Sequence, residues 1–134
     1  MLIDTGVFIS AADRHEPHHD ECAQLLRTHR DLRVTAPVIP ETAWLLEDRL
    51  GPEAEVRFLR FVTSDRIGIV DATRADYDRS IELIGLYADL GLGFVDASVI
   101  AIAERLGIST IATLNRRDFA VVRPAHVDAF DLVP

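Results

Sequence analysis

The chain has 134 residues, of which 49% are hydrophobic and 27% are charged, so it can bury one hydrophobic core and we expect a single domain over 1–134. The formal net charge of −8 argues against a protein that binds nucleic acid through overall positive charge. All 14 basic residues are arginine, and the lack of lysine excludes a Walker A loop, which requires Gly-Lys.

The first residues predict a buried strand that turns at once into a helix. Met1-Leu2-Ile3 is apolar and ends at Asp4, and a further apolar run begins at Val7. An aspartate in this place is an ordinary helix N-cap. In open α/β sheets, however, ligands bind beyond the carboxyl ends of the strands, so Asp4 is also the first candidate site residue.

The next segment, His15-Glu16-Pro17-His18-His19, matches the H-E-x-x-H pattern of zinc sites in letters only. That pattern requires both histidines on one helix face, and Pro17 is tolerated only in the first turn of a helix. We therefore expect a solvated loop, followed by a helix over 18–30 in which Cys22 faces the core. The single cysteine can form neither an internal disulfide nor a thiol metal site.

A second strand is predicted over 32–36, followed by helices over 42–50 and 53–64. Glu41 lies between the strand and the first of these helices, where an acid is common, but it also follows a strand end. Core burial is the default for the aromatic residues of this region, and a partner groove or dimer face is the alternative for Trp44, Phe58 and Phe61.

The third strand is predicted over 66–70, and the helix after it extends from residue 71 to about residue 90. Its spacing of apolar residues predicts an inward face made of Tyr77, Ile81, Ile84 and Tyr87 or Ala88.

The helix that begins at Phe94 is apolar almost all the way round, which is typical of a helix in the middle of a domain. Asp96 near its start is either an N-cap or a site residue, because a buried carboxylate requires a partner. A strand over 109–113 and a polar turn over 114–119 follow, and the turn holds Asn115, Arg116, Arg117 and Asp118. A last short strand is predicted over 129–133.

Strands that alternate with helices at this spacing predict an α/β fold, a three-layer α/β/α sandwich around a central, mostly parallel sheet of four to five strands. Asp4, Glu41 and Asp118 would follow strand ends, and Asp96 would open the buried helix, so one rim of the sheet could gather all four acids. Grouped carboxylates repel one another, and a divalent cation removes that cost. A set of oxygen ligands favours Mg²⁺, or Mn²⁺, over zinc.

Four short segments also resemble the PIN-domain ribonucleases, and among them the VapC-type toxins of bacterial toxin–antitoxin pairs. The segments are Leu2-Ile3-Asp4-Thr5-Gly6, Pro40-Glu41, Phe94-Val95-Asp96-Ala97 and the run from Ala112 to Phe119. Their order and spacing, together with the total length, extend the resemblance over essentially the whole chain.

The resemblance implies that Asp4, Glu41 and Asp96 are acidic site residues and that Thr5 is a polar residue near the metal. The family commonly has an aspartate two positions after the threonine of the last segment, where this chain has Asn115. We expect Asp118 to supply the missing negative charge and Asn115 to offer a neutral oxygen, with Asp4, Asp96 and Asp118 as the metal ligands.

By the same resemblance, the expected activity is Mg²⁺-dependent or Mn²⁺-dependent hydrolysis of RNA, with Asp4, Glu41, Asp96 and Asp118 as the catalytic acids. Arginines near the rim are candidates for contacts with RNA phosphates, and these are Arg14, Arg116 and Arg117. The family implies a homodimer and a cognate antitoxin that blocks the site. No apolar run is long enough for a membrane span and no secretory signal is recognised, so we expect a cytoplasmic protein.

Two other functions stay open at this point. One is a PIN fold weakened by Asn115 into a module that binds RNA or antitoxin without cutting. The other is a different metal-dependent phosphoryl-transfer enzyme on the same type of sheet.

Overall fold

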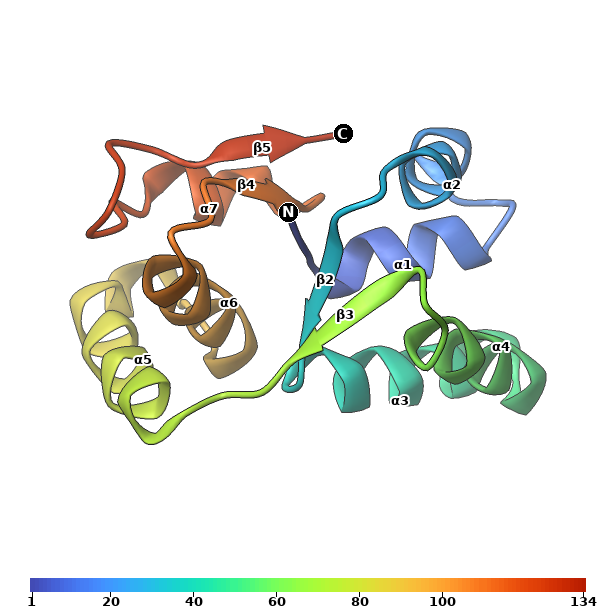
Figure 1. The fold of residues 1–134 in the computed structure, drawn as a ribbon, viewed down its shortest axis with the longest axis horizontal. Helices are drawn as coiled ribbons and strands as arrows, with labels where there is room; N and C mark the ends of the chain where they lie inside the picture. Colours follow the sequence, from blue (N-terminus) through green and yellow to red (C-terminus); the bar gives the residue numbers. More distant parts are fainter.

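Five strands form one sheet in which every neighbouring pair is parallel, in the order β3-β2-β1-β4-β5. The computed structural model describes all 134 residues (Figure 1). The strands are β1 (Leu2–Ile3), β2 (Leu32–Thr35), β3 (Ile67–Val70), β4 (Thr110–Ala112) and β5 (Asp131–Val133). The first strand is thus the central one, and the predicted parallel sheet is confirmed.

Helices cover both faces of this sheet, which gives the predicted three layers. Figure 1 shows the first four helices on one side of the strands and α5 with α6 on the other. The helices are α1 (Thr5–Ala12), α2 (His19–Thr28), α3 (Val38–Leu50), α4 (Pro52–Val62), α5 (Arg74–Leu86), α6 (Phe94–Leu106) and α7 (Arg116–Val121), with a short 3-10 helix η1 (Ala88–Leu90).

The core lies where α6 packs on the sheet. Every residue from Ala97 to Ala103 is buried, as the all-round apolar pattern of this helix predicts. Cys22 is also fully buried. Phe58 packs edge to face on Phe8 with 5.1 Å between ring centroids, so it belongs to the core and not to a partner groove. Trp44, in contrast, is 63% exposed.

Several element boundaries differ from the predictions. The helix predicted from residue 71 to about residue 90 is α5 over Arg74–Leu86, because Thr73 caps it, and the 3-10 helix η1 follows separately. The last strand is shorter than predicted and begins at Asp131. The helix after β2 begins at Val38 and not at residue 42, because Pro40 falls in its first turn, where the helix needs no backbone N–H donor. The segment over 114–119 is not a turn throughout, since α7 begins at Arg116.

The predicted inward face of α5 is wrong. Asp76, Ser80 and Leu83 are buried, whereas Tyr77 is 49% and Ile81 is 69% exposed. The buried face is polar because Asp76 pairs with Arg105 of α6, with an N–O distance of 2.9 Å. Apolar periodicity does not register a buried ion pair of this kind.

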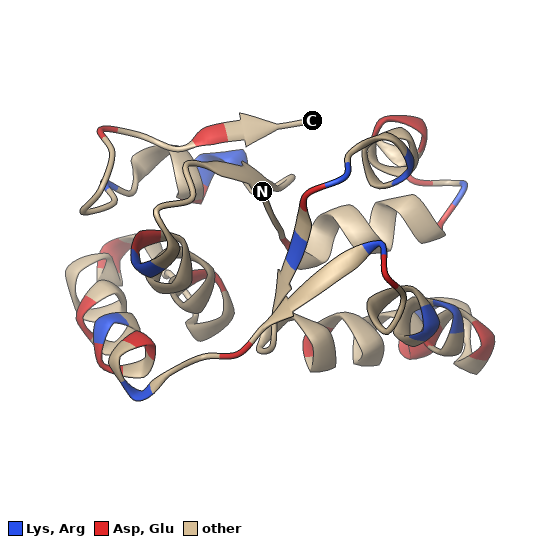
Figure 2. Ribbon diagram, viewed as in Figure 1, with Lys and Arg blue, Asp and Glu red and all other residues tan.

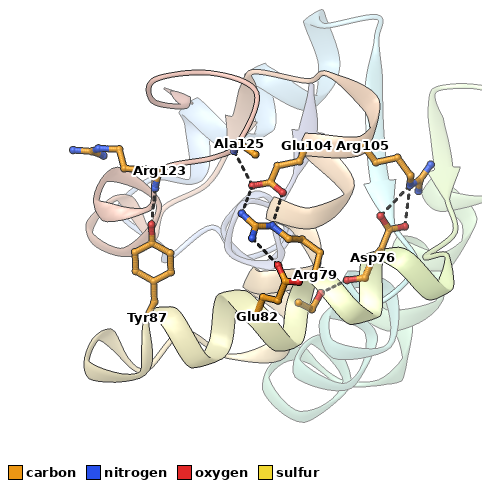
Figure 3. A network of polar contacts seen from close by, with 9 residues as sticks. Asp76, Arg79, Glu82, Tyr87, Glu104, Arg105, Arg123 and Ala125 are labelled. Atoms are coloured by element: carbon orange, nitrogen blue, oxygen red, sulfur yellow. Dashed lines mark hydrogen bonds and ion pairs between the residues drawn. The ribbon is translucent and has the colours of Figure 1, made fainter.

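A polar network fixes α5 against α6 and against the loop after α7 (Figure 3). Arg79 of α5 donates hydrogen bonds to Glu104 of α6 at 2.8 and 3.0 Å and to Glu82 at 2.9 Å. Glu104 also accepts a hydrogen bond from the backbone N–H of Ala125. The hydroxyl of Tyr87 accepts one from the backbone N–H of Arg123. These contacts hold α5 in one position over α6.

Charged residues of both signs lie mainly on the helices and the turns that join them (Figure 2). None of the helices has the length and apolar character that a membrane crossing requires.

Candidate active site

Asp4 is the one residue between the central strand β1 and helix α1. Its backbone N–H still pairs with the carbonyl of Ala112 in β4 at 2.9 Å. One carboxylate oxygen caps α1 by accepting a hydrogen bond from the N–H of Thr5 at 2.7 Å. The other oxygen accepts one from the hydroxyl of Thr113 at 2.8 Å, and the residue is 5% exposed. The N-cap role expected for Asp4 is therefore real, and it leaves the carboxylate at the carboxyl edge of the sheet.

Glu41 reaches the same place from the first turn of α3. The hydroxyl of Thr5 donates a hydrogen bond to its Oε2 atom. Thr5 therefore lies between two acids, since its backbone N–H binds Asp4 and its hydroxyl binds Glu41.

Asp96 and Asp118 meet at Asn115. The side-chain amide nitrogen of Asn115 donates to Asp96 at 3.1 Å and to Asp118 at 2.9 Å. The backbone N–H of Asn115 donates to the hydroxyl of Thr113 at 3.0 Å, and Thr113 in turn donates to Asp4. Asp96 is not a cap, because Gly93 holds that position in α6.

One continuous path of hydrogen bonds therefore connects all four predicted acids. It runs from Glu41 through Thr5, Asp4, Thr113 and Asn115 to Asp96 and Asp118. The residues come from the ends of β1 and β4 and from the first turns of α3, α6 and α7.

The pKa values of Asp96 and Asp4 are raised, chiefly by burial and further by the neighbouring carboxylates. Burial raises the pKa of Asp96 to about 7, and the charge of Asp4 adds to this effect, with smaller additions from Glu41 and Asp118, while the hydrogen bond from Asn115 opposes it. Burial also raises the pKa of Asp4, against the hydrogen bonds from Thr113 and Thr5. The pKa of Asp118 is lowered by its hydrogen bond from Asn115 and by Arg117. Ionising Asp4 and Asp96 therefore costs free energy in the folded protein unless a cation binds them.

The donor set fits an oxygen-bound divalent cation. Asp4, Glu41 and Asp96 form no ion pair, so no arginine of the chain offsets their charges. Carboxylate oxygens without histidine or cysteine are the ligands that Mg²⁺ and Mn²⁺ prefer. No three His, Cys, Asp or Glu side chains are already arranged around one metal position. The nitrogen of Asn115 faces the two acids, so its amide would have to turn over to present the oxygen that we expected as a ligand.

The three arginines predicted near the phosphate take different positions. Arg14 lies beyond the last residue of α1, whereas Asp4 caps the first, and its contact with RNA phosphate stays a prediction. Arg117 pairs with Asp118 at 2.9 Å and is 76% exposed. Arg116 is exposed and donates a hydrogen bond to the carbonyl of Pro134.

Thr113 connects the two halves of the site, although no role was predicted for it. Its hydroxyl is fully buried, donates to Asp4 and accepts from Asn115. Its position directly after the last residue of β4 was the available signal, because the other site residues also follow strand ends.

A cleft of about 640 Å³ reaches the site at Glu41, the one acid of the four that lines it. Glu41 lies in its wall, with Asp71 and Tyr77 on the β3–α5 side and Phe94 and Val95 from the start of α6. A ligand in this cleft would therefore contact the same Glu41 that binds Thr5.

Comparisons with known proteins agree with this geometry. Over its full length the chain is 29% identical to ribonuclease VapC26 of Mycobacterium tuberculosis, covering 100% of both chains. Its fold matches the crystal structure of VapC20 of the same organism, described as a sarcin–ricin loop cleaving toxin, with a TM-score of 0.84, 20% identity and coverage of 94% and 97% of the two chains. It also matches VapBC2 of Rickettsia felis, solved with a DNA fragment of its promoter, with a TM-score of 0.71, 16% identity and coverage of 99% and 98%. The profile of the PIN domain matches residues 1–123, and the chain therefore belongs to the PIN-domain family.

Proposed function

We propose that this protein is a metal-dependent endoribonuclease, a toxin of the VapC type that hydrolyses RNA phosphodiester bonds and is inhibited by a cognate antitoxin. Membership of the PIN-domain family and the likeness to a protein named ribonuclease VapC26 support this proposal. The observation that carries it is the hydrogen-bonded path that joins Asp4, Glu41, Asp96 and Asp118 at one edge of the sheet.

In this proposal Asp4, Asp96 and Asp118 hold Mg²⁺ or Mn²⁺. Such an ion, when bound, polarises a phosphoryl oxygen and lowers the pKa of a water molecule. Thr113 keeps Asp4 in place, and Asn115 separates Asp96 from Asp118. Glu41 lies in the wall of the cleft, where it can accept the proton of the attacking water, and the hydroxyl of Thr5 fixes its orientation.

Arg116 and Arg117 are the proposed phosphate contacts, because both are exposed on the first turn of α7, next to Asp118. A guanidinium can bind two phosphate oxygens at once, which suits an RNA backbone.

The partners follow from the same likeness. Matched structures include VapBC complexes and a toxin–antitoxin complex from Klebsiella pneumoniae, so we propose an antitoxin for this chain as well. We also propose a homodimer, and action on RNA in the cytoplasm. The exposed Trp44 of α3 is the side chain we assign to a protein contact, since it lines a surface groove together with the apolar side chains of Ile39 and Leu59.

The test compares the cleaved RNA ends in cells that express the wild-type chain, the Asp4→Asn variant or the Asp20→Asn variant. Asp20 is an exposed acid of α2 and serves as the control. We expect new RNA ends with the wild type and with Asp20→Asn, and a loss on the order of 100-fold with Asp4→Asn.

Cuts that appear equally with Asp4→Asn would remove the carboxylate mechanism. The purified chain separates the alternatives. Binding of RNA without cleavage, even with Mn²⁺, would identify a binding module weakened by Asn115. Turnover of a small phosphate diester in place of RNA would identify another phosphoryl-transfer enzyme.

A further inference from the structure

Two aromatic side chains that take no part in the core are stacked in the wall of the active-site cleft. The rings of Tyr77 and Phe94 are nearly parallel, with an angle of 10° between their planes and 5.7 Å between their centroids. Both line the cleft that also contains Glu41. They are 49% and 42% exposed, so part of each ring is accessible to a ligand in the cleft.

This arrangement differs from every other aromatic contact of the protein. Phe8 meets Phe58 at 63°, and Phe119 meets Phe130 at 64°, which are the edge-to-face contacts of a packed core. A parallel pair at the surface can instead be continued by a third flat ring, because stacking leaves one face of the pair free.

The two helices that carry the pair, α5 and α6, are joined by ion pairs. Tyr77 follows Asp76, which is 2% exposed, accepts two hydrogen bonds from the guanidinium of Arg105 and forms a capping box with Thr73. Phe94 is the first residue of α6, the helix to which these ion pairs tie α5 (Figure 3). A ligand that stacks here therefore does not have to order the platform first.

The charges of the cleft indicate which part of an RNA it would accept. Its wall contains the carboxylates of Glu41 and Asp71 and no arginine. Two carboxylates repel a phosphate, but they can accept hydrogen bonds from the N–H groups of an uncharged nucleobase.

We propose that the Tyr77–Phe94 pair is a stacking platform for one unpaired nucleobase of the RNA substrate, next to the phosphate that is cut. This inference rests on the proposed function, which it deepens: the substrate is single-stranded at this position, since a paired base is not free to stack on protein rings. Tyr77 and Phe94 are thus specificity-determining residues, and neither is one of the acids of the site.

The first measurement needs no metal and no cleavage. The fluorescent nucleoside 2-aminopurine riboside is titrated with the full chain in EDTA, and stacking is recorded as saturable quenching. We expect Phe94→Leu and Tyr77→Leu each to weaken binding by roughly tenfold. Tyr77→Phe keeps the ring and should bind like the wild type, because the Tyr77 hydroxyl has no hydrogen-bond partner in the protein. Ile81→Ala, which removes an exposed apolar side chain one turn further along α5 and outside the cleft, is the matched control.

The second measurement uses RNA cleavage with Mg²⁺. Phe94→Leu should raise KM in proportion to its effect on the nucleoside and change kcat less, whereas a general disturbance of α6 would lower kcat. Quenching that is absent in the wild type, or unchanged in both leucine variants, would overturn the platform. If the wild-type chain cuts no RNA but still quenches the nucleoside with the expected variant pattern, the proposed function fails and the base-binding site stands.

Sedimentation velocity tests whether a second copy of this chain, and not a nucleobase, covers the Tyr77–Phe94 pair. The platform predicts the same sedimentation coefficient for the wild type and for both leucine variants. Conversion of a dimer to a monomer by these substitutions would show that the pair is covered by a partner, and the inference would be wrong.

Discussion

At the scale of single residues, Asp96 is the side chain whose environment departs most from an ordinary surface acid. An aspartate in the first turn of a helix is normally stabilised by the helix dipole. Here burial and the neighbouring carboxylates raise its pKa from 3.8 to about 7. A folded chain without metal therefore binds a proton at Asp96 that the unfolded chain releases, over the range between these two values.

The raised pKa of Asp96 makes the folded protein less stable as the pH increases. Below about pH 4 Asp96 is protonated in both states and makes no difference, and as the pH rises towards about 7 the free energy of unfolding falls. Replacing Asp96 by Asn removes this cost. In EDTA at about pH 8 we expect Asp96→Asn to raise the free energy of unfolding by about 1–4 kcal/mol, and at about pH 4 to leave it nearly unchanged.

Urea unfolding at both pH values measures the difference. Asp20→Asn, on the exposed face of α2, is the control and should behave like the wild type at each pH. A gain in stability that is the same at both pH values would mean that ionisation of Asp96 is not its source.

The acids of the site could be predicted from the sequence, but the hydrogen bonds that join them could not. Asp4, Glu41 and Asp118 were predictable because each follows a strand of a parallel sheet, and such strands end at one edge. The position of Thr113 directly after β4 pointed to the same edge of the sheet, but its two hydrogen bonds were not predictable, because a buried threonine at a strand end is also ordinary core composition. The position of Arg14 relative to Asp4 depends on the length of α1, whose eight residues separate the two side chains.

At the scale of elements, α5 shows where periodicity fails. The pattern of Tyr77 and Ile81 predicts an inward apolar face, but the buried face contains Asp76. A carboxylate can be buried when a guanidinium pairs with it, and Arg105 is located on another helix, so no local pattern could reveal the pair. Tyr77 and Ile81 are therefore exposed, and the ring of Tyr77 lines the cleft together with that of Phe94 from α6.

The ion pair between α5 and α6 leads to a prediction on stability. Arg105→Met leaves the buried carboxylate of Asp76 with Thr73 as its remaining donor, so we expect the free energy of unfolding to fall by about 3 kcal/mol, the low end for a broken buried pair because Arg105 is itself 33% exposed. The double variant Asp76→Asn/Arg105→Met should lose less, because the neutral amide can still accept the hydrogen bond from Thr73.

Chemical denaturation of the three chains gives these values. Arg33→Met is the matched control, since Arg33 pairs with Asp31, whose side chain is 76% exposed, and such a pair contributes about 0–1 kcal/mol. Equal losses for Arg105→Met and Arg33→Met would contradict the structural role of the buried pair.

At the scale of the whole molecule, alternation of strands and helices was enough to predict the layers and the parallel sheet. It could not define the strand order, in which β1 is central and β4 lies beside it. That order is what brings Thr113 and Asn115 from the end of the chain to Asp4 at its beginning. Four acids spread over the sequence become one site through this pairing, while the molecule as a whole carries a net charge of −8.

The clustering of four acids and the net charge of −8 together predict how divalent cations act on the folded protein. An ion that binds only the folded state stabilises it by an amount that grows with the logarithm of its concentration relative to Kd, about 2.7 kcal/mol at a hundredfold excess over Kd. We expect Mg²⁺ and Mn²⁺ to raise the Tm, and to raise it more at about pH 8 than at about pH 5.5, because at the lower pH the cation must displace the proton held by Asp96.

Differential scanning calorimetry at constant ionic strength, with NaCl in place of the divalent salt as the reference, separates binding from screening of the net charge of −8.

Asn115→Asp should lower the Tm in EDTA by adding a repelling carboxylate beside Asp96 and Asp118, and should enlarge the rise in Tm that Mg²⁺ produces. Asp4→Asn should reduce that rise. An equal rise in Tm for Asp4→Asn and the wild type would mean that the cation acts on the surface charge and not at the edge of the sheet.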